Sequence, residues 1–337
     1  MTRSRSKQHA HIKDTHQQPL VYIVILNYGT ADDVLELIES LCAVSYTRYH
    51  VVVIDNASPD DSVSVLKKRL PSTITLIANT ENNGFAGGNN VGIRYALEKG
   101  ADYCLLLNPD TVVHERFLDE LISVAENPRA VEILAMEHKG VTPGMWGPRI
   151  LYYDLDAPPT KAQSNIVYFD GGALNAMLTE GRPQNYRARV ADLKRSKPFV
   201  CDYVTGAALL VSREVIEQIG LIPEEYFLYY EDTEWNIRAH RAGYASVTVP
   251  ASIIWHKESR STKKFSYNYL YYLTRNGYFL AMRNGNLWQR IAVYPFSFFK
   301  FLKQPVKWIL IPSKRSFVKP IMRATFDFWR HRMGQRS

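Results

Sequence analysis

The chain has 337 residues, 46% of them hydrophobic and 22% charged, as expected for a globular protein with a sizeable core. Its three cysteines, Cys42, Cys104 and Cys201, lie far apart without CxxC spacing, which argues against a disulfide framework or zinc knuckle and favours a reducing compartment. The net charge of +8 is uneven, because residues 257–337 hold 17 Lys and Arg against 2 acids. This asymmetry predicts that the C-terminal part meets an anionic partner, either a membrane surface or a nucleic acid.

The N-terminal residues 1–19 are polar and basic and contain no apolar segment of the kind that a signal peptide requires. We expect them to form a disordered tail. No uncharged apolar stretch approaches the roughly 18 to 20 residues of a transmembrane helix. The sequence therefore predicts no membrane-spanning segment.

The first third of the chain alternates apolar, β-branched segments with segments of helical spacing. Near-continuous apolar strands separated by helices are typical of a parallel sheet covered on both faces, a Rossmann-like α/β fold. Ligands of such sheets bind beyond the carboxyl ends of the strands. We expect strands at 21–27, 50–58, 74–80 and 103–110, and helices at 31–41, 60–70 and 88–99.

Polar residues follow each predicted strand. Asn27 and Tyr28 follow the first, Asp55 the second, and Asn108 and Asp110 the fourth, while "NTENNGFAGGNN" follows the third. Any one of these clusters is explained equally well by a turn or a helix N-cap. Four such clusters at one edge of a sheet predict a nucleotide site.

The glycines in "NNGFAGGNN" permit a ligand to approach the backbone closely, and they lead into a helix whose N-terminus favours a diphosphate. No GxxxxGK[ST] occurs and no GxGxxG follows the first strand, which disfavours P-loop NTPases and NAD enzymes. Asn108 and Asp110 are two positions apart, so an extended backbone directs both side chains to one side. They are suited to hold a divalent cation with phosphate oxygens, although a simple turn explains them too.

The segment "YFLYYEDTEWNIRAHRAGY" contains three acids beside six aromatic residues. In a helix that begins near Asp232, Glu231 and Asp232 point off the N-terminus into a cleft. Glu234 and Arg238 are i, i+4 partners, which predicts a structural ion pair. The alternative is that all three acids only stabilise the helix start, with Gly243 capping its end.

Together the motifs "VILNYGT", "VVVIDNAS", "NNGFAGGNN", "LLLNPD", "YFLYYEDTEW" and "IIWHKES" resemble inverting glycosyltransferases of family two with the GT-A fold, especially the rhamnosyltransferase-like branch. The resemblance covers roughly residues 20–280. We accordingly expect a catalytic domain at 20–265, with a nucleotide-sugar half at 20–128 and an acceptor half at 129–265. Within the latter we expect short antiparallel strands and a charged excursion, followed by a basic, aromatic-rich helical extension at 266–337.

The resemblance implies particular roles in donor binding. Asn27 and Tyr28 correspond to the strand end beneath the nucleoside, and Asp55 to the acid that reads the imide edge of uracil or thymine. Asn108 and Asp110 match the metal-binding DxD motif, with Asn in place of its first acid. The residues matching the loop that closes over the sugar nucleotide are Asn83, Gly84, Gly88 and Asn89.

The resemblance also implies the catalytic groups. Asp232 matches the general base that takes the proton of the acceptor hydroxyl, and Glu231 supports it. The neighbouring aromatics, Trp235 among them, form a wall on which a sugar stacks. His256 matches a histidine that, with Asp110, holds a divalent metal, Mg or Mn, or the diphosphate. The basic loop 259–264 behind it is expected to contact phosphates.

The C-terminal part combines 13 aromatic residues between Phe265 and Phe301 with many Lys and Arg. Such segments are typical of the headgroup region of anionic bilayers. Nucleic acid is the competing partner, but no RRM, KH or helix-turn-helix pattern supports it. A third explanation is a helical tail that packs its aromatics on the catalytic domain.

The sequence therefore predicts a cytoplasmic enzyme, peripheral on the inner face of the cell membrane. Its predicted reaction is metal-dependent, inverting transfer of a sugar, L-rhamnose from dTDP-rhamnose, to a lipid-linked or cell-surface polysaccharide acceptor. One alternative is a catalytically silent sugar-nucleotide or glycan-binding protein of the same fold. Another is a sugar-1-phosphate nucleotidyltransferase, disfavoured because its glycine-rich loop would follow the first strand.

Overall fold

The computed structural model describes residues 18–137, 141–154, 162–257 and 265–336. The predicted tail, up to residue 17, and the predicted basic loop 259–264 lie outside these ranges. All seven predicted elements of the first third are present, although α3 begins four residues earlier than expected. They are β1 (Val21–Asn27), α1 (Ala31–Leu41), β2 (Tyr49–Asp55), α2 (Ser62–Arg69), β3 (Thr75–Ala78), α3 (Gly84–Glu98) and β4 (Tyr103–Leu107).

The middle of the chain contains the predicted antiparallel strands, but it differs from its prediction in the placement of one strand. One strand there, β6, is twelve residues long and buried along most of its length, and it lies in the central sheet instead of in a peripheral excursion. The further elements are β5 (Thr111–Val113), α4 (Phe117–Ala125), α5 (Pro128–Glu137), β6 (Thr142–Tyr153), β7 (Gln163–Phe169), β8 (Gly172–Leu174), β9 (Gly181–Pro183), β10 (Phe199–Cys201), β11 (Ala208–Ser212), α6 (Arg213–Ile219), α7 (Glu231–Arg241) and β12 (Tyr244–His256).

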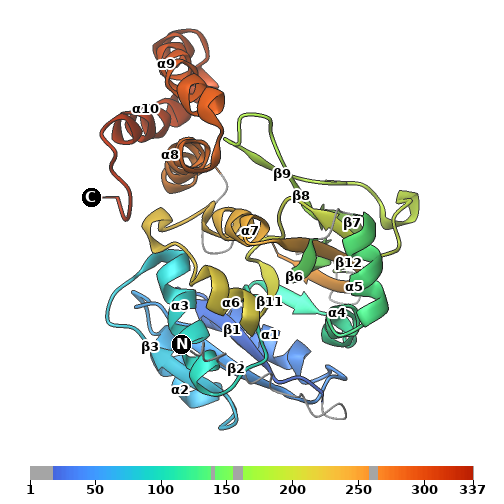
Figure 1. Cartoon of the computed structure of the whole chain (residues 1–337). Helices are drawn as coiled ribbons and strands as arrows, with labels where there is room; N and C mark the ends of the chain where they lie inside the picture. Colours follow the sequence, from blue (N-terminus) through green and yellow to red (C-terminus); the bar gives the residue numbers. More distant parts are fainter. Residues whose placement is uncertain (1–17, 138–140, 155–161, 258–264, 337) are drawn as a thin grey trace, which may run out of the picture.

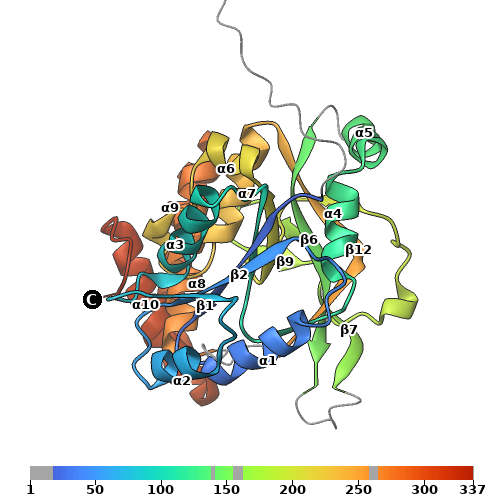
Figure 2. The same ribbon diagram turned by 90° about the horizontal axis from the view of Figure 1, so that it is seen from below.

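The central sheet has the order β10-β12-β6-β11-β4-β1-β2-β3, with β5 paired to β12 and β7 to β6. Parallel pairing joins β3, β2, β1 and β4, and joins β6 to β12, while β11 runs antiparallel between the two groups. Helices α1, α2 and α4 pack on one face and α3, α6 and α7 on the other. Figure 2 shows α1 and α3 on opposite sides of β1 and β2.

Three helices form the C-terminal extension, as predicted: α8 (Tyr267–Asn284), α9 (Leu287–Leu310) and α10 (Arg315–Trp329). Figure 1 shows α8 nearest to the sheet domain, beside α7, and α9 farthest from it. Several aromatics of α8 and α10 are buried in a small core with Tyr226 and Tyr230, so part of the aromatic content does pack on the domain. None of the helices in the described ranges combines the length and apolarity needed to cross a bilayer.

The register of β1 and β2 explains why the polar clusters meet. Asn27 pairs with Asp55, so both strands end at the same level. The loop after β3 adds Asn79 and Asn82, whose side chains are bonded to that of Asn56 at 3.0 and 2.9 Å. The predicted polar edge of the sheet is thereby assembled into one hydrogen-bonded surface.

Candidate active site

A cleft of about 810 Å³ opens at the carboxyl ends of β1, β2 and β4 and extends to α7 and α8. Its volume is in the range of small-molecule sites. The structure brings together in its wall seven of the thirteen residues singled out from the sequence. They are Tyr28, Gly84, Asn108, Asp110, Glu231, Asp232 and His256.

On the β1 side, Tyr28 is 42% exposed and presents its ring to the cleft. Asn27 and Asp55 are fully buried one layer beneath. The Asp55 carboxylate accepts bonds from the Asn27 amide at 2.7 Å and from the backbone and hydroxyl of Ser58 at 2.9 and 2.7 Å. In this structure Asp55 therefore supports the Asn27 and Ser58 side chains, whereas the prediction had it facing a nucleobase.

Backbone N–H groups of the glycine-rich loop are hydrogen-bonded to other parts of the protein. The Gly84 N–H donates to Asn82 at 2.9 Å, and the Phe85 N–H donates to the Phe227 carbonyl at 2.7 Å. A Cβ on Gly84, whose φ is +70°, would lie 2.2 Å from that same carbonyl oxygen. These two N–H groups are therefore bonded within the protein, one to Asn82 and one to the 227 loop, whereas the prediction had the start of α3 cradling a diphosphate.

Other residues expected to bind substrate do not line the cleft. Gly88 brings α3 close to β1, where a Cβ would meet Leu26 at 2.4 Å. The Asn89 amide donates within the helix to the Phe85 carbonyl at 2.9 Å, and the Asn83 backbone N–H donates to Asn56 at 3.3 Å.

The predicted stacking role of Trp235 is also wrong. Its side chain is completely buried in the core on the α3, α6 and α7 face, and its indole N–H donates to the Gly220 carbonyl at 2.9 Å. The aromatic wall of the cleft consists instead of Phe227, Tyr229 and Tyr230, together with Tyr168.

Asp110 and His256 form one corner of the cleft. The antiparallel pairing of β5 with β12 sets Thr111 opposite His256 and so brings the two side chains together. Asp110 Oδ1 lies 3.3 Å from His256 Nε2, both nearly buried. The Tyr168 ring stacks on the imidazole with centroids 4.8 Å apart. Within the described ranges no three His, Cys, Asp or Glu side chains are grouped so that they could hold a metal ion. Asn108 lines the cleft together with Asp110 and His256.

Asp232 lies at the start of α7, deep in the cleft but with its side chain partly exposed. Its Oδ2 accepts from the Gly206 N–H at 2.8 Å and from the Thr205 hydroxyl at 3.3 Å. Its Oδ1 accepts from the Thr233 N–H and hydroxyl at 2.6 and 3.2 Å. Burial raises the pKa of Asp232, and these donors partly oppose the rise.

Glu231 and Glu234 have different surroundings. Burial, and then the charge of Asp232, raises the pKa of Glu231 well above its ordinary value. Glu234 points away from the cleft, where it accepts a bond from the Tyr226 hydroxyl at 2.9 Å. It also pairs with Arg238 at 3.4 Å, which confirms the predicted i, i+4 ion pair.

Asn236, on α7, was missed by the sequence analysis. It is fully buried and bonds both the N–H and the carbonyl of Val204 at 3.0 Å. Its amide also donates to the Asp232 carbonyl at 2.7 Å. Asn236 therefore fixes the loop that supplies two of the donors to Asp232.

Asn276, on α8, was also missed by the sequence analysis, and it lies about fifty residues along the chain from the loop that it binds. Phe227, Tyr229 and Tyr230 all have positive φ, between 66 and 71°, which is unfavourable for residues with a Cβ. The buried Asn276 amide donates to the carbonyls of Tyr226, Leu228 and Tyr229 at 2.8 to 3.0 Å. This Asn276 clamp holds the strained loop that carries the aromatic wall.

The fold and cleft are those of a glycosyltransferase with the GT-A fold. A family model described as "Glycosyl transferase family 2" matches residues 22–220, and the chain belongs to this family.

Among curated relatives, a low-salt glycan biosynthesis hexosyltransferase of Haloferax volcanii is 27% identical over 77% of this chain and 74% of its own. A dTDP-rhamnosyl transferase of Shigella flexneri is 25% identical over 78% and 80%. An N-acetylglucosaminyl-diphospho-decaprenol L-rhamnosyltransferase of Mycobacterium tuberculosis is 25% identical over 79% and 86%. A mannosyltransferase of Pyrobaculum calidifontis, solved with GDP-Man and Mn²⁺, shares the fold at 14% identity over 94% and 88%, with a TM-score of 0.55.

Replacing Asn276 with Ala removes three bonds to a buried, strained loop. We expect the free energy of unfolding to fall by about 1–3 kcal/mol and sugar transfer to slow, because the 227–230 wall loosens. Denaturant unfolding and initial-rate assays measure the two effects. Asn165→Ala is the control, since Asn165 is exposed on β7. Equal stability of Asn276→Ala and the control would show that the clamp contributes nothing.

Proposed function

We propose that the protein transfers a sugar from a nucleotide diphosphate to a hydroxyl acceptor with inversion at the anomeric carbon, using Asp232 as the general base. The observation that carries this proposal is the Asp232 carboxylate, which is partly exposed to the cleft while four protein donors fix its orientation. A fixed carboxylate in a cleft suits abstraction of a hydroxyl proton during attack.

The proposed reaction follows from this placement. The acceptor oxygen attacks the anomeric carbon on the face opposite the departing diphosphate, and its proton passes to Asp232. The raised pKa of Asp232 strengthens it as a base. Phe227, Tyr229 and Tyr230 offer ring faces and edges for contacts with a sugar.

We further propose that a divalent cation, Mg or Mn, binds at Asp110 and His256. A carboxylate oxygen 3.3 Å from an imidazole nitrogen supplies two ligands of a type that suits Mn²⁺. Asn108 lines the same cleft and provides a further oxygen. A cation held by these residues would supply positive charge to offset that of the leaving diphosphate.

The substrates are proposed from relatives and chemistry together. Two of the relatives above are named as rhamnosyltransferases, one for a dTDP sugar and one for a lipid-diphosphate acceptor. We propose dTDP-L-rhamnose as donor and a lipid-linked glycan as acceptor. In this proposal Tyr28, which follows β1 and lines the cleft, stacks on the base of the nucleotide.

We also propose that α9 lies on the inner face of the cell membrane. Twelve of its large hydrophobic residues are exposed, among them Trp288, Phe299 and Ile309 at 61 to 77%. The helix carries four cations and no acid. An exposed apolar face beside Lys and Arg favours the interface of an anionic bilayer.

Asp232→Asn should lower kcat by about 10² to 10⁴-fold, because the amide cannot accept the proton, while donor binding is unchanged. In the wild type, the rate should fall as pH drops through a pKa above the ordinary Asp value, since protonated Asp232 is inactive. Initial rates and donor titration calorimetry measure these effects. Asp61→Asn, an exposed acid on the surface, is the control. Turnover of Asp232→Asn within twofold of wild type would exclude this base.

Asp110→Ala and His256→Ala should each weaken Mn²⁺-dependent donor binding by about tenfold or more, because each removes a metal ligand. The measurement is donor affinity with Mn²⁺ and with EDTA. His50→Ala, at an exposed imidazole, should bind like wild type. A metal response that survives both cleft substitutions would place the cation elsewhere.

The triple variant Trp288→Ser, Phe299→Ser, Ile309→Ser should lose flotation with phosphatidylglycerol vesicles, since it removes exposed apolar area from α9. Wild type should float with these vesicles, less at high salt, and less with phosphatidylcholine alone. The double variant Ile133→Ser, Met136→Ser removes exposed apolar side chains from α5 and serves as control. Undiminished flotation of the triple variant would rule out α9 as the contact.

A further inference from the structure

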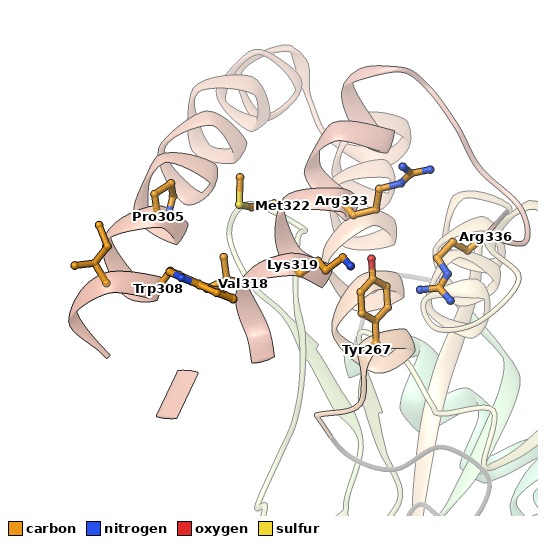
Figure 3. A pocket seen from close by; sticks show the side chains of 9 residues that line it. Tyr267, Pro305, Trp308, Val318, Lys319, Met322, Arg323 and Arg336 are labelled. Carbon is orange, nitrogen blue, oxygen red and sulfur yellow. The ribbon is translucent and has the colours of Figure 1, made fainter. Parts of the chain in front are cut away.

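A groove of about 780 Å³ lies between α9 and α10, outside the catalytic cleft. Its walls are mostly apolar, and its volume matches that of small-molecule sites. Figure 3 shows Pro305 and Trp308 of α9 at one end with Val318 and Met322 of α10 beside them, and Lys319, Tyr267 and Arg336 at the other end. The groove is therefore polarised along its length.

The apolar end opens beside the surface that we propose to meet the bilayer. Trp308 and Ile309 line the groove and are also 49 and 70% exposed on α9. An apolar chain can therefore pass from the bilayer interface into the groove while it remains in contact with apolar side chains.

The other end presents two cations. Lys319 and Arg336 are exposed and form no ion pair with the residues that the structure describes, whereas Arg323 is bound to Asp327 at 2.8 Å. The Arg336 guanidinium stacks over the Tyr267 ring, 4.4 Å from its centroid, and the backbone N–H of Arg336 donates to the Tyr272 hydroxyl at 2.9 Å. A stacked guanidinium keeps its N–H edge available for phosphate oxygens.

The cationic end adjoins the catalytic cleft. Arg336 lines both the groove and the cleft, and Tyr267 of the groove lies between Ser266 and Asn268, which line the cleft. A molecule with an apolar chain, a phosphate group and a polar head can thus occupy both cavities in that order.

We infer that the groove binds the lipid diphosphate of the acceptor. Its isoprenoid chain lies between α9 and α10, its diphosphate contacts Lys319 and Arg336, and its sugar extends into the cleft toward Asp232. This inference rests on the proposed function, which supplies the lipid-linked acceptor. A second copy of the chain is a less suitable occupant, because two cations that form no ion pair with the described residues favour an anionic ligand at that end of the groove.

The test is titration calorimetry of the full chain with farnesyl diphosphate, farnesol and inorganic diphosphate, with excess dTDP to block the proposed donor site. Farnesyl diphosphate should bind at least about tenfold more tightly than either part alone. Lys319→Gln and Arg336→Gln should each weaken its binding by about tenfold, and Trp308→Ser should do the same from the apolar end.

Two controls are matched in chemistry. Lys303→Gln and Trp288→Ser change the same residue types on α9 outside the groove and should bind farnesyl diphosphate like wild type. Equal binding by all variants, or equal losses in groove and control variants, would overturn the inference. So would a groove variant that changes the oligomeric state on sizing columns, since the groove would then be a contact between copies.

Transfer assays separate this inference from the proposed function. The groove variants Lys319→Gln and Trp308→Ser, which lie outside the cleft, should lose transfer to a polyprenyl-diphosphate acceptor but keep transfer to the same sugar on a short, water-soluble alkyl chain. Unchanged transfer to the polyprenyl acceptor would overturn the groove assignment alone. Specific binding of farnesyl diphosphate without transfer to either acceptor would instead contradict the proposed function and leave the groove assignment standing.

Discussion

The arrangement of the cleft depends on the hydrogen bonds from Asn276 to the loop that precedes α7. That loop contains three residues with positive φ, each of which costs on the order of 1–3 kcal/mol. Arg275 adds a bond to the Tyr226 carbonyl at 3.2 Å and another to the Gly334 carbonyl at 2.9 Å. Phe227 in turn accepts from the start of α3. One short loop thus joins the start of α3, the start of α7 and the C-terminal helices.

Because of these contacts, the C-terminal extension is more than the membrane anchor proposed above. A tail that served only as a membrane anchor would need no buried polar contacts with the catalytic part, yet Arg275 and Asn276 are almost completely buried. Because α8 both clamps the 227–230 wall and supports α9 and α10, the orientation of the exposed face of α9 relative to the cleft is fixed by packed helices. Any contact that α9 makes with lipid is therefore made at a defined distance from Asp232.

The features that could be predicted from the sequence are those that depend on local periodicity. Alternating strands and helices, and the Glu234–Arg238 pair, follow from spacing alone. Periodicity does not show which face of α7 meets the core, so Trp235 was placed beside the sugar although it is buried. The sequence predicts that Gly88 contacts a ligand. A glycine that lets a helix pack closely on a strand cannot be distinguished in sequence from one that lets a ligand approach the backbone. Asn276 was missed because its partners lie about fifty residues away, although Arg and Asn inside the apolar "YYLTRNGYFLAM" were a signal of buried polar contacts.

The two acids at the start of α7 are chemically distinct despite being adjacent. Asp232 has four donors, whereas Glu231 Oε2 is buried with no hydrogen-bond partner among the described residues. Donors stabilise a carboxylate and desolvation destabilises it: burial and then the Asp232 charge raise the pKa of Glu231 well above its ordinary value, whereas the donors to Asp232 oppose the rise that burial causes there. Local burial and hydrogen bonding, more than the identity of either acid, thus set the two carboxyl groups apart.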